Sequence, residues 1–396
     1  MTAPTLDAEP ACPGPLEGLP TIPTEHAPDL RAEQRPFDSI PPETWDRLAA
    51  ANPWATPFAS WAFHRAWWDA YGENAHDETL VVCAEGASGD EPVAIVPLMH
   101  RHEVEPTDAA TRTTMRHADH GGLTTVPPTA KAILFGASYH ADYATILAAP
   151  ASLPAVSRAV AEYVASPVSG GWDVVDLRRL RCQDPTGTQL AAAFDATAAA
   201  DGWTLAVERE DVCPVVTFPD GVDIEGFLAT LGKKERHEIR RKVRRAEAAG
   251  ELRLIDSDDP GADLELFIEL HQRRWGDRGL FPKTRGGEQS RVMVRRLLEL
   301  FGTHGPLRLT ILKVGDRPIA TGLHFETPTD LLYYNAGIDP DARELSPGVL
   351  MIHAYVRRAL ERGIRRMDFL RGDESYKYEW GAVDEPIQRV LVRRAA

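Results

Sequence analysis

The sequence predicts a mixed α/β protein built from two tandem domains of similar design, preceded by a disordered tail. Three observations support this prediction: an order of strands and helices that occurs twice, a globular composition, and a length of 396 residues. That length suffices for two domains of about 150 residues each. An apolar fraction of 43% is typical of a globular chain.

The repeated order begins with a hairpin in each half. Gly89-Asp90-Glu91-Pro92-Val93-Ala94 corresponds to Gly315-Asp316-Arg317-Pro318-Ile319-Ala320, and apolar segments flank both. Gly-Asp favours the tight turn of a hairpin. A further strand, an amphipathic helix and another strand follow each hairpin. The expected strands are 79–84, 93–100, 143–147 and 172–177 in the first half and 307–314, 319–325, 331–338 and 367–370 in the second, with helices over 156–164 and 349–360.

These elements divide the chain into a tail and two domains. Residues 1–36 are rich in Pro, Ala, Glu and Thr, and we expect them to be disordered because they bury too little apolar surface to offset the ordering entropy. The first domain is predicted over 37–200 and the second over 201–396. Each should be a mixed, strongly twisted sheet flanked by helices.

Composition also restricts partners and location. A net charge of −15 disfavours attraction of the whole molecule to nucleic acid or to an anionic membrane. The four cysteines, Cys12, Cys83, Cys182 and Cys213, form no C-x-x-C motif, and we interpret them as reduced thiols. The sequence shows no signal peptide and no apolar run of about 20 residues, so we expect a cytoplasmic protein without membrane insertion.

Several common sites have no sequence signature here. There is no G-x-G-x-x-G or Walker motif, no H-E-x-x-H or Cys/His cluster, and no G-x-S-x-G elbow. We therefore expect no bound metal, no dinucleotide and no serine nucleophile.

Three segments are candidates for chemistry. Before the second predicted helix, Ser346-Pro347-Gly348 is either an ordinary helix start or an anion site, with Arg343 adding a cation. The segment 233–245 contains eight Lys or Arg among thirteen residues, and is either a solvated helix or a patch for an anionic ligand such as CoA phosphates or a tRNA backbone. In a helix over 264–277, Trp275 beside several Arg either lines a pocket or covers the helix end.

The last thirty residues hold the densest polar loop. The segment 366–381 reads as a short strand followed by a loop with Asp, Glu, Lys and two Tyr. Loops carry such residues for function more often than cores do.

These motifs resemble the GNAT acyltransferase superfamily in its duplicated form, which includes CelD-like acetyltransferases and the Fem-type aminoacyl transferases. The hairpin at 315–320, the strand 332–338 and the helix opening at Ser346 resemble the GNAT core. The basic helix followed by Arg273-Arg274-Trp275 resembles the CelD-like branch, and Tyr376-Lys377-Tyr378 resembles the aromatic-Lys motif of Fem-type enzymes. The usual pyrophosphate loop Q/R-x-x-G-x-G/A and the long coiled-coil arm of tRNA-using Fem enzymes are absent.

The resemblance implies two GNAT-like domains and transfer of an acyl group, by default acetyl, from acyl-CoA to an amine of a small molecule or saccharide. Direct attack on a thioester needs a base, an oxyanion donor and an acid, but no enzyme nucleophile. We expect Asp368 or Asp373 as base, Tyr376 as acid and Lys377 as a stabiliser of negative charge. The expected acyl-CoA contacts are Tyr334, Asn335, Ala336, Gly337, Arg343, Ser346, Gly348 and Val349, with a backbone N–H in 334–337 meeting the oxyanion. The expected acceptor contacts are Arg274, Trp275 and Arg371.

Under this interpretation only the second domain binds the acyl donor, and the first is a degenerate copy that contributes to the acceptor cleft. Two alternatives stay open. One is a Fem-type transferase that uses aminoacyl-tRNA, which would show salt-dependent RNA binding through Arg240, Arg241 and Arg244. The other is a non-catalytic scaffold or sensor on a decayed acyltransferase fold.

Overall fold

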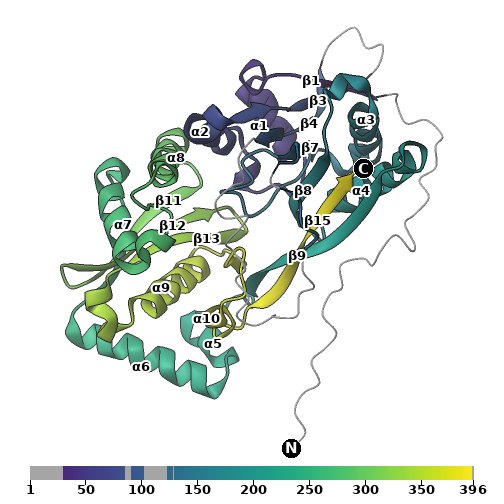
Figure 1. The fold of residues 1–396 in the computed structure, drawn as a ribbon. Helices are drawn as coiled ribbons and strands as arrows, with labels where there is room; N and C mark the ends of the chain where they lie inside the picture. The colour runs from purple at the N-terminus through teal and green to yellow at the C-terminus, as the bar shows by residue number, and fades with distance from the viewer. Residues whose placement is uncertain (1–29, 85–90, 102–122, 128, 395–396) are drawn as a thin grey trace, which may run out of the picture. The chain divides into compact units, whose positions relative to one another are not determined.

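Helices and strands alternate throughout the described chain, and the predicted mixed α/β class is confirmed (Figure 1). The computed structural model describes residues 30–84, 91–101, 123–127 and 129–394. These residues form two units. The first comprises the described residues up to Val212 together with 385–394, and the second comprises 213–384. The last strand of the chain therefore belongs mostly to the first unit, whereas the sequence predicted a second domain over 201–396.

The first unit contains two sheets. Its strands are β1 (Leu30–Gln34), β2 (Ala75–Asp77), β3 (Leu80–Ala84), β4 (Pro92–Val96), β5 (Leu98–Arg101), β6 (Ala132–Phe135), β7 (Leu147–Ala148), β8 (Val174–Arg181), most of β9 (Thr204–Thr217) and most of β15 (Val383–Arg393). One sheet has the order β1-β3-β4-β7, and in the other β9-β15-β8-β6-β5-β2 are neighbours. The helices are α1 (Pro42–Ala50), α2 (Trp61–Tyr71), α3 (Leu153–Ala165) and α4 (Pro185–Asp201). The predicted apolar stripe of α3 is buried at Val156, Val160 and Val164.

Three expectations for this unit need correction. Residues 30–34, predicted as part of the disordered tail, form β1, because all five pair with β3 and Leu30 packs against the core. The predicted strand 143–147 is reduced to β7, since the Ile146 carbonyl accepts a hydrogen bond from Asn52 Nδ2 (2.8 Å). Cys83 and Cys213 are free thiols, but Cys182 is disulfide-bonded. Residues 1–29 of the predicted tail and the Gly89-Asp90 turn lie outside the described residues.

The second unit is a mixed sheet between two layers of helices. Its elements are α5 (Ile224–Thr230), α6 (Lys233–Ala249), β10 (Leu252–Asp256), α7 (Pro260–Trp275), α8 (Arg285–Phe301), β11 (Leu307–Val314), β12 (Arg317–Glu326), β13 (Asp330–Ile338), α9 (Pro347–Glu361), β14 (Arg366–Asp368) and α10 (Ser375–Tyr378). The strand order is β10-β11-β12-β13-β14, and residues 215–217 of β9 pair with β14. Figure 1 shows α7 and α8 on one face of β11–β13 and α9 on the other.

Two glycines let helices approach this sheet closely. A Cβ on Gly337 of β13 would lie 2.8 Å from the backbone nitrogen of His271, so α7 rests directly on the strand. On the opposite face, Gly322 of β12 leaves room for the Tyr355 hydroxyl of α9, which bonds Thr310 Oγ1 (2.6 Å). Side chains at these positions would force the helices away from the sheet.

The predicted order of elements occurs in both units. In the second, the hairpin β11–β12 is followed directly by β13, α9 and β14. In the first, two further strands, β5 and β6, lie between the hairpin β3–β4 and the series β7, α3 and β8, and β8 pairs with β6. Both hairpins and the strands that follow them are antiparallel. Among the described residues, none of the helices is both long enough and apolar enough to span a bilayer.

Two buried histidines predict an acid-sensitive first unit. Burial lowers the pKa of His64 and of His140 to about 3, from an ordinary value near 6.5. The unfolded chain therefore takes up protons below about pH 6.5 while the folded unit does not, and the stability present above that pH is lost as the pH falls towards 3. Each histidine contributes about 1.4 kcal/mol per pH unit in this window.

We therefore expect His64→Gln to weaken the pH dependence. Between pH 6 and pH 4 the wild-type protein should lose about 2–3 kcal/mol more of its free energy of unfolding than the variant. Urea denaturation at both pH values measures this difference, with His237→Gln, at an exposed position of α6, as the control. Equal losses in wild type and His64→Gln would contradict the assignment.

Candidate active site

The candidate site lies where β13 leaves its neighbour β14. These parallel strands pair at three positions, the last being Leu332 with Asp368. On its other side β13 stays paired with β12 as far as Ile338, with a bulge at Tyr334. The edge of β13 from Tyr333 onwards therefore extends beyond β14.

A tight turn after β14 produces this separation. Asp368, which is buried, accepts a hydrogen bond from the Leu370 N–H at 2.7 Å. Leu370 itself has φ of 57°, a left-handed conformation that is uncommon for a branched residue, and Gly372 has φ of 107°. The chain thus turns away from β13 within two residues of the end of β14.

Lys377 holds the turn from inside. Its side chain is 2% exposed, and Nζ donates to the carbonyl oxygens of Leu370 (3.0 Å), Arg371 (3.0 Å) and Gly372 (2.8 Å). The same ammonium is 2.9 Å from Glu374 Oε2. Because an ammonium has three protons, these contacts use its full donor capacity. This geometry fits a role for Lys377 in holding the loop. For Lys377 to contact a reacting group, as predicted, one of its bonds to the loop would have to break.

The edge of β13 carries its own polar partners. The Ala336 N–H donates to Asn335 Oδ1 (2.9 Å), and the Ala336 carbonyl lies 3.1 Å from His271 Nδ1. His271 Nε2 accepts from the Leu280 N–H (3.0 Å), so Nδ1 carries the proton and donates to Ala336. Burial lowers the pKa of His271, which favours this neutral form. Of the predicted acyl-CoA contacts, 334–337 therefore line one continuous edge.

A group of aromatic side chains occupies the point of divergence. The Tyr333 ring packs edge-on against Phe369 (6.2 Å) and Tyr355 (5.5 Å), and Phe369 packs against Tyr376 (6.1 Å). Burial raises the pKa of Tyr333 and of Tyr376 above the ordinary value of 10, although 39% of Tyr376 is exposed. The negative charge of Glu374 raises the pKa of Tyr376 further. Both phenols are protonated at neutral pH and can donate a proton or a hydrogen bond.

The predicted anion site forms the beginning of α9. Ser346 is at the N-cap position in a left-handed conformation (φ 61°, ψ 57°), but its hydroxyl makes no capping bond to the helix. Instead Oγ accepts from Arg245 of α6 at 3.0 Å. Pro347 has no N–H, and the Val349 N–H bonds the Ser346 carbonyl (3.0 Å). Arg343 is exposed, so Arg343 and Arg245 place two cations beside this helix end.

A charged cluster fixes the turn between β13 and α9. Asp339, only 5% exposed, lies 2.8 Å from Arg317 and 3.0 Å from Arg273, and its Oδ1 accepts from the Asp341 N–H (3.0 Å). Burial alone would raise the pKa of Asp339, but the bonds from Arg317 and Asp341 and the charge of Arg273 hold it below its usual value. The ionised carboxylate thus secures the turn that leads into the helix.

Two of the predicted acceptor contacts, Arg274 and Trp275, are exposed at the end of α7. The Arg274 guanidinium lies 4.9 Å from the Trp275 ring, and Trp275 is 42% exposed. Arg371 is half-buried, and its carbonyl is one of the three bonded by Lys377. Asp373 is 2% exposed.

Sequence reasoning missed four residues that shape the site. Tyr333 lies in the predicted strand 331–338 and Glu374 in the polar segment 366–381, and neither has a role in the sequence-based prediction. His271 lies in the predicted helix 264–277, and Asp339 directly follows the predicted strand 331–338. A signal existed for Asp339, because Asp before Pro in D-P-D commonly begins a turn. Nothing in the sequence indicated the tautomer-specific bond of His271 to β13.

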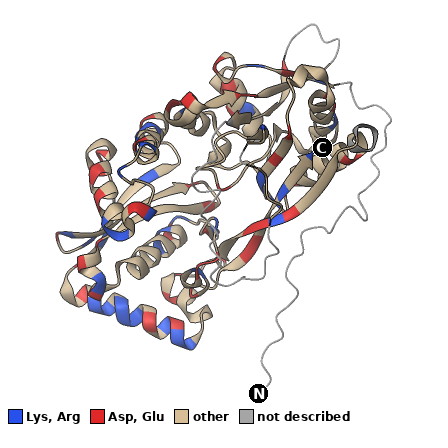
Figure 2. Cartoon of the chain, viewed as in Figure 1, with Lys and Arg blue, Asp and Glu red and all other residues tan. Residues whose placement is uncertain are grey.

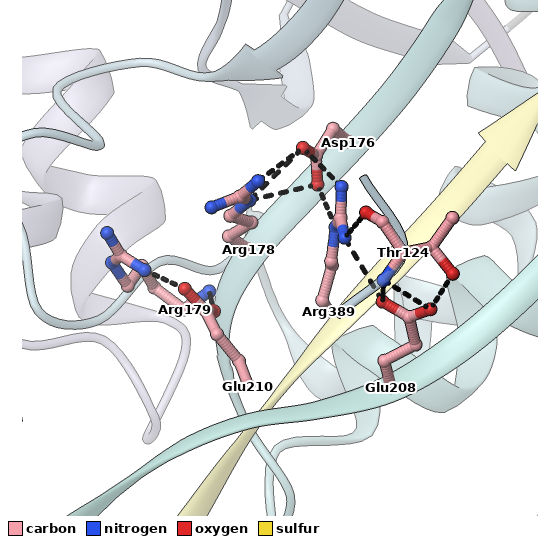
Figure 3. Close-up of polar contacts among 7 residues, drawn as sticks. All are labelled: Thr124, Asp176, Arg178, Arg179, Glu208, Glu210 and Arg389. Atoms are coloured by element: carbon pink, nitrogen blue, oxygen red, sulfur yellow. Dashed lines mark hydrogen bonds and ion pairs between the residues drawn. The ribbon is translucent and has the colours of Figure 1, made fainter. Parts of the chain in front are cut away.

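In the first unit, the strand that corresponds to β14 is β8, and charged side chains of this strand form ion pairs with one another or with neighbouring strands. Arg389 of β15, fully buried, donates to both carboxylate oxygens of Asp176 (2.5 and 2.8 Å) and to Glu208 (3.1 Å), as Figure 3 shows. Arg178 also contacts Asp176, and Arg179 pairs with Glu210. Burial would raise the pKa of Asp176, but the bonds from Arg389 and Arg178 hold it below its usual value. This carboxylate is saturated by arginines.

Among the described residues, no group of three or more His, Cys, Asp or Glu side chains is arranged to hold a metal ion. The prediction that the reaction uses no metal stays a prediction.

Comparison with known proteins identifies the class. Residues 233–378 match the family described as an acetyltransferase (GNAT) domain, which spans α6 to α10 and includes the whole site described above. The second unit therefore contains a segment that is similar to a GNAT acetyltransferase domain. No curated protein sequence matches the chain.

Solved structures extend the likeness to nearly the whole chain. FemX superposes with a TM-score of 0.56 at 10% identity, covering 88% of this chain and 96% of FemX. A conserved protein of unknown function from Bacteroides thetaiotaomicron gives 0.51 at 12% identity, covering 90% and 98%. The C-terminal domain of a putative lysylphosphatidylglycerol synthetase from Agrobacterium fabrum gives 0.51 at 10% identity, covering 89% and 91%. At these identities the likeness shows the fold, and the predicted Fem-like fold is confirmed.

Lys377 is predicted to be a major determinant of stability. Lys377→Met would leave three loop carbonyls and Glu374 without their cation, at a cost of about 2–4 kcal/mol. Tyr376→Phe, which removes only a hydroxyl from a partly exposed ring, should change the free energy of unfolding by less than about 1 kcal/mol. Urea denaturation of both variants tests this contrast, and a Lys377→Met protein as stable as Tyr376→Phe would refute the structural role.

Arg389 should be equally critical in the first unit. Arg389→Met removes the fully buried partner of Asp176, leaves Arg178 beside the carboxylate, and should cost about 3–5 kcal/mol of unfolding free energy. The double variant Arg389→Met/Asp176→Leu should recover part of that loss, because the incompletely paired buried carboxylate is then gone. Arg393→Met, at an exposed position on the same strand, is the control. A double variant no more stable than Arg389→Met alone would contradict this account.

Proposed function

We propose that the protein is an N-acyltransferase that moves an acyl group, by default acetyl, from acyl-CoA to an amine of a small molecule or saccharide. The observation that carries this proposal is the separation of β13 from β14 beyond Leu332 and Asp368, next to the start of α9 and within a GNAT domain. That separation leaves a strand edge along which an extended acyl donor can bind by hydrogen bonds to the backbone.

The start of α9 supports binding of the donor's phosphates. Helix N-termini favour anions through free N–H groups and the helix dipole. Here the Ser346 side chain leaves the first turn uncapped, and Arg245 and Arg343 supply positive charge. Gly348 has no side chain to cover this helix end, and a Cβ there would make a close contact with Ile338 Cδ1 (3.3 Å).

The reaction in this proposal is direct aminolysis. The amine nitrogen attacks the thioester carbonyl carbon, the carbonyl oxygen becomes an oxyanion, and the C–S bond then breaks. The amine loses one proton to a base, and the leaving thiolate gains one from the Tyr376 hydroxyl, which solvent reprotonates. Because its pKa is raised, Tyr376 is protonated at neutral pH, so its hydroxyl is present as a donor when the thiolate leaves.

The base is a carboxylate of the loop that follows β14. Asp368 and Asp373, the two predicted candidates, are both buried, so either would act through a bound water. Glu374 is the third candidate, because its side chain is 31% exposed and its charge acts on Tyr376. In this proposal Lys377 positions the loop that presents these groups. In the first unit Asp176 is already paired with Arg389 and Arg178, which supports the proposal that this unit has no acyl donor site of its own.

Calorimetric titration with acetyl-CoA, free CoA and a long-chain acyl-CoA tests the proposal. We expect micromolar binding that weakens at least tenfold in Gly348→Asp, because a carboxylate at the start of α9 repels the phosphates. Gly286→Asp places the same charge in the first turn of α8, where a Cβ has space, and should leave binding unchanged. Tyr376→Phe should bind the donor normally and lower kcat by about 100-fold.

The alternative donor is aminoacyl-tRNA. The observation that supports it is the density of Lys and Arg side chains along α6 (Figure 2). Lys233, Lys234 and Arg244 are exposed there. Absence of CoA binding, together with RNA binding that falls steeply with salt and is weakened in Arg244→Gln, would replace acyl-CoA by aminoacyl-tRNA. Absence of both would leave the scaffold interpretation.

A further inference from the structure

Two adjacent arginines at the end of α7 have opposite surroundings. Arg273 lies within 4 Å of three carboxylates, those of Glu269 (3.8 Å), Asp339 (3.0 Å) and Asp341 (2.6 Å). Arg274 is exposed and has no acidic partner within the described part of the chain, and its guanidinium lies 4.9 Å from the centre of the Trp275 ring. The first arginine therefore fixes the fold, while the second keeps its charge available.

Arg274 follows His271 by three residues on α7, and the bond of His271 to the Ala336 carbonyl (3.1 Å) places this end of the helix against β13. The positive charge of Arg274 lowers the pKa of Tyr333, Tyr376 and His271, opposing the larger effect of burial on the two tyrosines and adding to it on the histidine. These groups lie on β13, on α10 and on α7 itself. The guanidinium thus acts on the point where β13 and β14 diverge.

Aromatic surface lies beside the same charge. Among the large apolar residues that are exposed in the described ranges, only Trp275 (42%) and Tyr376 (39%) are aromatic. Exposed aromatic side chains next to an arginine are typical of binding sites, because they offer apolar area and a directed cation together. The acidic side chain that acts on Tyr376, Glu374, is already paired with Lys377. Arg274 therefore adds to this surface a positive charge that has no ion-pair partner among the described residues.

We propose that the acceptor is an amine that also carries an anionic group, a carboxylate or a phosphate, which Arg274 binds while Trp275 and Tyr376 contact the acceptor's ring or apolar part. A guanidinium matches both groups through two parallel hydrogen bonds. In the alternative, Arg274 only stabilises the C-terminal end of α7 through the helix dipole, and the protein would then bind anionic and neutral amines equally well. This inference rests on the proposed function, since it names the acceptor class for that same site.

Binding of matched ligand pairs tests the proposal without requiring turnover. The probes are phenylalanine against phenethylamine, which differ by a carboxylate, and glucosamine 6-phosphate against glucosamine, which differ by a phosphate. Each is titrated calorimetrically into the full-length protein, with and without saturating CoA. We expect the anionic member of at least one pair to bind at least tenfold more tightly, and the pair that shows this effect distinguishes a carboxylate from a phosphate.

The variants assign the preference to one side chain. In Arg274→Gln the two members of the pair should bind within twofold of each other. Arg278→Gln, at another exposed position just beyond α7, should keep the preference. Equal binding in the wild-type protein, tighter binding of the neutral amines, no measurable binding of any probe, or a preference that persists in Arg274→Gln would each overturn the proposal.

The same titrations separate this inference from the proposed function. Loss of CoA binding alone, with the anionic preference intact, would reject acyl-CoA as the donor and leave the acceptor class standing. Normal CoA binding without an anionic preference would reject the acceptor class and leave the acyltransferase proposal standing.

Discussion

The separation of β13 from β14 is the constraint on which the site depends. Parallel neighbours normally continue side by side because each unpaired backbone group costs free energy. Here β14 ends at Asp368, and the carbonyls of the following turn are bonded by Lys377 in place of a strand. The Lys377 ammonium bonds three carbonyls of the turn and pairs with Glu374. The turn carbonyls therefore have hydrogen-bond partners although β14 does not continue beside β13.

The other side of the opening depends on how closely helices approach β13. Gly337 lets α7 rest on the strand, and His271 then donates to the Ala336 carbonyl. The same helix ends at Arg274 and Trp275, so the packing that fixes α7 also fixes the exposed charge and aromatic surface beside Tyr376. A larger residue at 337 would displace both together, which couples a packing position to the proposed acceptor contacts.

Local pattern was sufficient to predict most elements of the fold. Apolar periodicity located α3, α9 and β13 within a few residues, and the repeated hairpins indicated two similar halves. The strand predicted over 143–147 was wrong because Asn52, distant in sequence, takes the Ile146 carbonyl. The site residues 334–337 were located by their strand, but no local signal shows that the Ser346 hydroxyl bonds Arg245 rather than its own helix. Such partners arise from tertiary contacts between distant segments.

The two units show how one order of elements can hold different chemistry. Asp176 is the third residue of β8 (Val174–Arg181), and Asp368 is the third and last residue of β14 (Arg366–Asp368). Asp176 is enclosed by Arg178 and Arg389, so its charge is already neutralised and its oxygens are occupied. Asp368 instead bonds the backbone of a turn whose loop displays Glu374 and Tyr376. In the second unit a backbone turn takes the place of the arginine partners of Asp176, so the side chains of the following loop are available for the proposed reaction. In the first unit the ion pairs of Asp176 instead connect neighbouring strands and stabilise the sheet.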